Sequence, residues 1–129
     1  MKAYIAFDIG GTQIKYGIVS ETGTVLKHKT VATEIHLGGE QIIQKLILLS
    51  KKLMNEHTIA GIGISTAGIV TGGADHIPGY STIPIIDRLQ EILKVPVSID
   101  NDVNCAAFGE KWNGSGREKE NFIMLTLGT

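Results

Sequence analysis

A short apolar run at residues 4–7 ends abruptly in Asp8-Ile9-Gly10-Gly11-Thr12, and a second apolar run follows at once at residues 14–19. This pattern predicts a buried strand, a tight glycine bend and a second strand that returns beside the first. Because a strand rather than a helix follows the glycines, the bend is neither a Walker loop nor a dinucleotide-binding loop. The start of the chain therefore predicts an antiparallel pair of strands joined by a bend that leaves room for a ligand.

The remaining pattern predicts an α/β fold with a mixed five-stranded sheet. Residues 24–33 alternate and predict a third antiparallel strand, and Gly17 inside the second strand indicates a close backbone approach. Beyond them, strands and helices alternate, which favours parallel strands with flanking helices. The expected helices cover residues 42–54, 85–94 and 103–112, and the expected strands cover residues 59–65, 97–99 and 122–127.

Composition excludes several classes of partner. The 129 residues carry a formal charge of −1 and show no cluster of Lys and Arg, so neither a nucleic acid nor an anionic membrane is an expected partner. Cys105 is the single cysteine and has no partner for an internal disulfide. The first apolar run is too short for a signal peptide, and no run approaches the length of a membrane span. These features predict a cytoplasmic protein.

The glycine bend is the first candidate site. Gly10 and Gly11 would let backbone amides approach an anion, the Thr12 hydroxyl could donate a further hydrogen bond, and Lys15 adds a positive charge. Asp8 beside a phosphate would require a divalent cation between them, as in magnesium–nucleotide sites. The alternative is a plain hairpin turn in which Asp and Thr satisfy the backbone.

The sequence Asp100-Asn101-Asp102 is the second candidate site, because it lies between a predicted strand and a predicted helix. Open α/β sheets bind ligands at the carboxyl ends of their strands. The helix macrodipole stabilises an ionised Asp102, which could then accept a proton. Asn and Asp are also preferred N-caps, so a capping role is the alternative, and both roles can hold together.

Residues 61–70 form a third candidate, in which small residues follow a strand and Ser65 and Thr66 supply hydroxyls. A plain turn is the alternative reading of this segment. Cys105 stands among small residues of the last predicted helix, which favours close packing of that helix on the sheet over a catalytic thiol.

Four segments together resemble the ROK family of bacterial sugar kinases, their relatives without known roles and sugar-responsive repressors. They are DIGGTQIKYGIV at 8–19, GIGISTAGIV at 61–70, DNDVNCAAFGE at 100–110 and LTLGT at 125–129. The resemblance implies a ribonuclease-H-like, actin-like ATPase fold with two lobes and an active site in the cleft between them. It implies ATP and Mg²⁺ as ligands and a sugar hydroxyl as the phosphate acceptor.

The resemblance also assigns residues, motif by motif. It implies Asp102 as the catalytic base and Asp8 as a contact to magnesium through water. The implied sugar contacts are Gly68, Ile69, Asn101 and Asp102. The implied phosphate contacts are Asp8, Gly10, Gly11, Thr12, Gly128 and Thr129, with Lys15 at a more permissive position.

Residues 1–129 are thus expected to be the N-terminal phosphate- and sugar-binding lobe of a two-lobe kinase. The second lobe, with its adenosine pocket and a zinc site, is absent from the sequence, so we expect the chain alone to be inactive. A homodimer is a possible state of the full-length protein. The alternatives are a non-catalytic sugar-binding relative and a sugar-sensing regulator, although Met1 leaves no room for a preceding helix-turn-helix. The sequence does not indicate which sugar is the substrate.

Overall fold

A computed structural model describes residues 1–67, 70–71, 74–75 and 84–127 of the chain. Its elements are β1 (Ala3–Ile9), β2 (Gln13–Ser20), β3 (Val25–Ala32), the 3-10 turn η1 (Ile35–Leu37), α1 (Gly39–Met54), β4 (Ile59–Thr66), β5 (Val70–Thr71), β6 (Ala74–Asp75), α2 (Ile85–Leu93), β7 (Val97–Asn101) and α3 (Asp102–Asn113).

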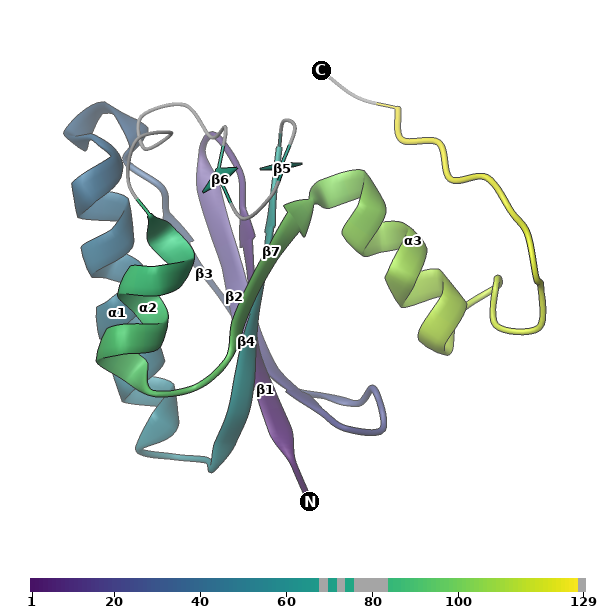
Figure 1. Ribbon diagram of the computed structural model, residues 1–129, viewed down its shortest axis with the longest axis horizontal. Helices are drawn as coiled ribbons and strands as arrows, with labels where there is room; N and C mark the ends of the chain where they lie inside the picture. Colours follow the sequence, from purple (N-terminus) through teal and green to yellow (C-terminus); the bar gives the residue numbers. More distant parts are fainter. Residues whose placement is uncertain (68–69, 72–73, 76–83, 128–129) are drawn as a thin grey trace.

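The central feature is a five-stranded sheet in the order β3-β2-β1-β4-β7 (Figure 1). The strands β3, β2 and β1 are antiparallel, whereas β1, β4 and β7 are parallel. The short strands β5 and β6 pair with each other in a separate hairpin. The predicted mixed sheet, with a meander on one side and parallel strands on the other, is confirmed.

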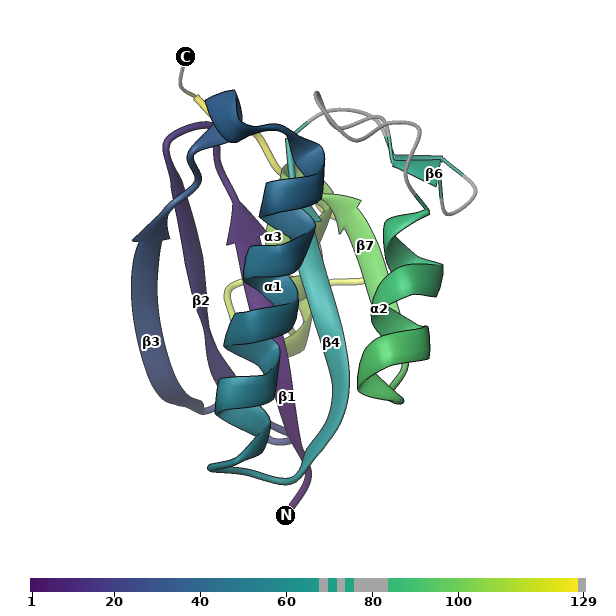
Figure 2. The ribbon, with the colours of Figure 1, turned by 90° about the vertical axis from the view of Figure 1, so that its left-hand side faces the viewer.

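One face of the sheet carries the hydrophobic core. In β1, buried and exposed residues alternate strictly, so Ile5, Phe7 and Ile9 face one side. The helices α1 and α2 lie against this side, and Figure 2 shows both in front of the sheet. Their apolar stripes include Leu46 and Leu89, both fully buried. The long helix predicted from the spacing of its apolar residues is therefore confirmed.

Gly17 lies where β2 and β3 approach each other closely. A Cβ atom at this position would stand 1.9 Å from the carbonyl oxygen of Lys27. The register between the two strands shifts next to it, between Ile18 and Val19. The close backbone approach inferred from a glycine within a strand is confirmed.

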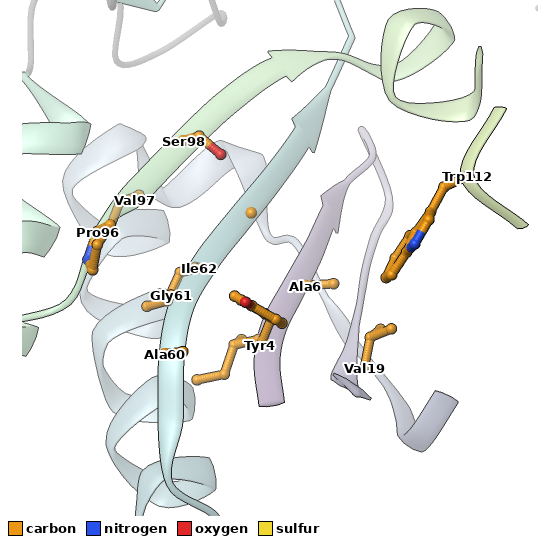
Figure 3. Close-up of a pocket in the computed structure, with 12 residues that line it drawn as sticks. Tyr4, Ala6, Val19, Ala60, Gly61, Ile62, Pro96, Val97, Ser98 and Trp112 are labelled. Atoms are coloured by element: carbon orange, nitrogen blue, oxygen red, sulfur yellow. The ribbon is translucent and has the colours of Figure 1, made fainter. Parts of the chain in front are cut away.

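The opposite face of the sheet is open, because α3 stands away from it (Figure 1). None of the described residues of α3 is buried. A hollow of about 500 Å³ lies between the sheet and the end of this helix, and Figure 3 shows Trp112 pointing toward Val19 across it, near Tyr4. The expectation that α3 packs closely on the sheet is wrong. None of the described helices combines the length and apolarity that a bilayer crossing needs.

Residues 122–127 were expected to form a strand, and this expectation is wrong. The segment has no regular secondary structure and runs outside α3, far from the sheet edge (Figure 1). All of its apolar side chains except Met124 are exposed, with Ile123 87% and Leu127 98% accessible. Alternating residues form a strand only where another strand supplies hydrogen-bond partners, and among the described residues none lies beside this segment.

Candidate functional site

The candidate site lies where the parallel strands β1, β4 and β7 end. The register places Asp8 beside Ser65 and Ser65 beside Asp100. On the antiparallel side, Lys15 of β2 pairs with Asp8. Because directly paired residues point to the same face of a sheet, these four polar side chains form one row across four strands. We call Lys15, Asp8, Ser65 and Asp100 the polar row.

Asp8 has the exposure and chemistry that a magnesium contact needs. Its side chain is exposed, and its Oδ1 accepts a hydrogen bond of 3.1 Å from the Ser65 hydroxyl. In the described part of the chain, no group of three or more His, Cys, Asp or Glu side chains could hold a metal ion by itself. Mg²⁺ commonly takes only one or two protein carboxylates and completes its shell with phosphate oxygens and water. Asp8 therefore fits a magnesium ion that arrives with a nucleotide.

The glycine bend is a hairpin turn that leaves two backbone amides open within the described part of the chain. The Gly10 N–H donates to the Gln13 carbonyl at 2.9 Å, as the hairpin reading predicted. Within the described residues, no hydrogen bond engages the amides of Gly11 and Thr12. Both residues are exposed, and no described atom lies within 4 Å of a Cβ placed on Gly11. An anion can thus reach these two amides.

At the start of α3, one residue caps the helix and the next residue exposes its carboxylate. Asn101 is the N-cap, and its Oδ1 accepts from Val103 N at 2.9 Å and from Asn104 N at 3.3 Å. Asp102 is the first helical residue, and its carboxylate remains exposed although Oδ1 accepts from Val103 N. Asp100 accepts from the Asn101 amide at 2.7 Å. The capping role belongs to Asn101, which leaves Asp102 accessible to a ligand.

The two parts of the site lie at the same edge of the sheet. Ile9, which precedes the bend, is in register with Thr66, and Thr66 is in register with Asn101. Two interstrand steps separate Ile9 from Asn101 by about 10 Å. Asp102 follows Asn101 directly, so it lies at the same sheet edge as the bend, on the other side of β4. The bend and Asp102 therefore flank β4 at one edge of the sheet.

Several predicted site residues cannot be placed. Gly68, Ile69, Gly128 and Thr129 lie outside the described residues.

Cys105 borders the polar row but has the character of a neutral thiol. It lines a second hollow, of about 760 Å³, together with Ser65, Asp100 and Phe108. Burial raises the pKa of the Cys105 thiol, and the nearby carboxylates raise it further, whereas a hydrogen bond with Ser65 opposes them. The prediction that this cysteine is not a nucleophile agrees with its surroundings.

Two residues beside the bend were missed in the sequence analysis. Thr33 is only 1% exposed, and its hydroxyl donates to the Gly10 carbonyl at 2.7 Å. Lys45 of α1 donates to the Ala32 carbonyl at 2.7 Å, next to Thr33. Thr33 lies 23 residues from Gly10, so only the register of β3 against β2 reveals the contact, and no local sequence pattern signals it.

Comparison with known proteins places these features in a family context. The model of the ROK family matches residues 4–129. A glucokinase from Halalkalibacterium halodurans is 35% identical over 136 residues, which cover 98% of this chain and 41% of that protein. A beta-glucoside kinase from Listeria innocua is 36% identical over 133 residues, which cover 96% of this chain and 43% of that protein.

The fold also matches solved structures. The ROK family glucokinase from Streptomyces griseus, in complex with glucose and AMPPNP, superimposes with a TM-score of 0.77 at 30% identity. The match covers 90% of this chain and 38% of that one. The chain therefore spans about two-fifths of the length of these relatives.

Proposed function

The chain belongs to the ROK family, and we propose that it is the N-terminal lobe of an ATP-dependent sugar kinase. The single observation that carries this proposal is the pairing of two features at one sheet edge. Open backbone amides at the Gly10–Thr12 bend lie across β4 from the exposed carboxylate of Asp102. The names of the relatives, among them a glucokinase and a beta-glucoside kinase, support phosphoryl transfer to a sugar.

The bend and the polar row would bind the nucleotide's phosphates. The amides of Gly11 and Thr12 point their partial positive charge at phosphate oxygens, and the Thr12 hydroxyl adds a donor. Lys15 contributes a full positive charge from the neighbouring strand. Asp8 would hold Mg²⁺ through water, and a bound magnesium ion neutralises charge that develops on the phosphate oxygens. Gly128 and Thr129 are proposed as further phosphate contacts.

Asp102 would act on the sugar. Its carboxylate accepts a hydrogen bond from the acceptor hydroxyl, orients the oxygen toward the phosphate and takes the proton late, because the phosphoryl-transfer transition state is loose. Asn101, Gly68 and Ile69 are proposed as the remaining sugar contacts in this lobe.

This lobe alone would form only half of a cleft. Because the chain spans about two-fifths of the length of its relatives, we expect the 129 residues by themselves to bind sugar and nucleotide weakly and to show negligible turnover. The adenosine pocket and any zinc site would belong to a second lobe. We further propose a cytoplasmic location and a homodimer as a state of the full-length protein.

The experiment that tests the proposed base compares Asp102→Asn with Asp87→Asn in the full-length protein. Asp87 lies in the first turn of α2, so the control makes the same change in the first turn of another helix. ADP release is measured across a panel of hexoses, hexosamines and beta-glucosides. Asp102→Asn should lower kcat by about 10²- to 10⁴-fold, since this is the usual contribution of a general base.

Affinity for MgATP should stay within about twofold in both variants, because neither change touches the bend. Unchanged turnover in Asp102→Asn would remove the proposed base. Sugar binding by the parental protein without ADP release would instead indicate a sugar-sensing regulator or a non-catalytic relative.

A further inference from the structure

Thr33 contacts the glycine bend from behind, on the side away from solvent. Its hydroxyl donates to the Gly10 carbonyl at 2.7 Å, and its backbone N–H donates to the Thr12 carbonyl at 2.9 Å. The side chain is buried, with 1% accessibility. Thr33 therefore binds two carbonyl groups of the bend at once, one on each side of Gly11.

These two bonds orient the amides of the bend because a trans peptide is planar. The C=O of one residue and the N–H of the next belong to the same peptide plane and point in opposite directions. When Thr33 holds the Gly10 carbonyl inward, the Gly11 N–H must point outward. That amide is one of the two that are open to an anion in the described structure.

The Thr33 hydroxyl also takes the place of a hairpin bond. A tight hairpin is usually closed by a reciprocal pair of backbone hydrogen bonds. Within the described residues, only one is present at this bend, from Gly10 N–H to the Gln13 carbonyl. The Gly10 carbonyl instead accepts the hydroxyl of Thr33. The geometry of the bend therefore depends on the side chain of Thr33, which directly follows β3, as well as on the backbone bond of the hairpin.

Thr33 is itself held in place by α1. The Lys45 ammonium donates to the Ala32 carbonyl at 2.7 Å and to Glu34 at 2.8 Å, and it lies 3.4 Å from the Thr33 carbonyl. The hydrogen bond from Lys45 lowers the pKa of the Glu34 carboxyl, which favours its ionised form. Glu34 adopts a left-handed backbone, which turns the chain away directly after Thr33.

We propose that Thr33 is a positioning residue for nucleotide binding: it fixes the Gly10–Thr12 bend so that the Gly11 amide is aimed at a phosphate before the nucleotide arrives. This inference rests on the proposed function of the bend. Preorganised donors bind more tightly because they lose less freedom on binding. Without the hydroxyl, the Gly10–Gly11 peptide can rotate, and the amide is aimed only part of the time.

The test uses the full-length protein and the variants Thr33→Val, Thr33→Ser and Thr24→Val. Valine keeps the shape of threonine but removes the hydroxyl, serine keeps the hydroxyl, and Thr24 is an exposed threonine at the opposite end of the sheet. In Thr33→Val, KM for MgATP should rise about tenfold, the upper value for one lost hydrogen bond. KM for the sugar and kcat should stay within about twofold.

Two further readouts separate positioning from general stability. Hydrogen exchange of the Gly10 amide, which donates to the Gln13 carbonyl in the bend, should be faster in Thr33→Val than in the parental protein, with the core strands unchanged. Thr33→Ser should restore both the exchange rate and KM for MgATP, and Thr24→Val should match the parental protein throughout. If valine prevents folding, Thr33→Ala is measured by the same criteria, and loss of folding in both variants would count against a positioning role.

Two results would overturn the inference. The first is an unchanged KM for MgATP in folded Thr33→Val, and the second is an equal rise of both KM values that serine does not rescue. If the parental protein transfers phosphate to no sugar, the proposed function fails, but the MgATP affinity measured by calorimetry still tests Thr33. Weaker MgATP binding by Thr33→Val would then support the inference, and equal binding, or none in either protein, would reject it.

Discussion

Replacing Gly17 with alanine should separate β3 from the rest of the sheet. The new methyl group would stand 1.9 Å from the Lys27 carbonyl oxygen and 2.9 Å from the carbonyl carbon of the same residue. Real Cβ atoms essentially never approach a heavy atom within 3.0 Å, so the two strands must move apart by about 1 Å. Both nearest atoms belong to the backbone, and no side-chain rotation can relieve the overlap.

The size of the effect follows from the ladder between β2 and β3. A shift of about 1 Å would lengthen an ordinary 2.9 Å hydrogen bond to about 3.9 Å, which no longer counts as a bond. Loss of the two or three bonds nearest Gly17, at about 1 kcal/mol each, gives a decrease of about 2–3 kcal/mol in the free energy of unfolding. For a chain of this size, Tm should fall by about 10 °C.

Urea and thermal denaturation followed by circular dichroism would measure this change. Gly63→Ala is the matched control, because Gly63 also lies within a strand of the same cross-strand row, yet no described atom lies within 4 Å of its added Cβ. That variant should be as stable as the parental protein or more stable by about 0.5 kcal/mol. A Gly17→Ala protein whose free energy of unfolding equals that of Gly63→Ala would refute the reasoning.

Three shorter predictions follow from other contacts. Gly11→Ala should leave Tm unchanged, because no described atom lies within 4 Å of its methyl group. It should weaken MgATP binding by about tenfold or more, because the methyl would stand where the proposed function puts a phosphate; calorimetry tests this. Arg88 holds the pKa of the Glu40 carboxyl at about 2, so the ion pair stabilises the fold above pH 4.5 and is lost as pH falls toward 2. The stability difference between parental protein and Arg88→Gln should therefore shrink over this range in acid titrations, and a constant difference would argue against it. Cys105→Ser should keep kcat within about twofold in ADP-release assays, because burial keeps the thiol protonated; a large loss would reveal a role for it.

The sheet and its helices could be predicted because local pattern and final environment agree. The strict alternation of β1 and the apolar stripe of α1 each need one buried face, and the fold supplies it. Gly17 correctly predicted a close approach of two strands, because a glycine within a strand usually marks a place where a side chain would not fit. The motif at Asp8–Thr12 and the one at Asp100–Asp102 lie at a common edge because they end two strands that are parallel to the same neighbour.

The failures share a different cause, which is the absence of a partner. Residues 122–127 have the composition of a strand, but a strand exists only when another one pairs with it. The small residues around Cys105 permit close packing of α3 on the sheet but do not enforce it. The contact between Thr33 and Gly10 depends on strand register alone, which residue types near Thr33 do not encode.

Because β4 pairs with both β1 and β7, its length and register determine how the two halves of the site are aligned. Adding or deleting one residue inside β4 would reverse which of its side chains face the core and would offset Asp100 from Asp8 by one step. The connections at the opposite end of the sheet could vary in length without that penalty. Insertions and deletions should therefore be tolerated in those outer loops, whereas the number of residues in β4 (Ile59–Thr66) must stay the same.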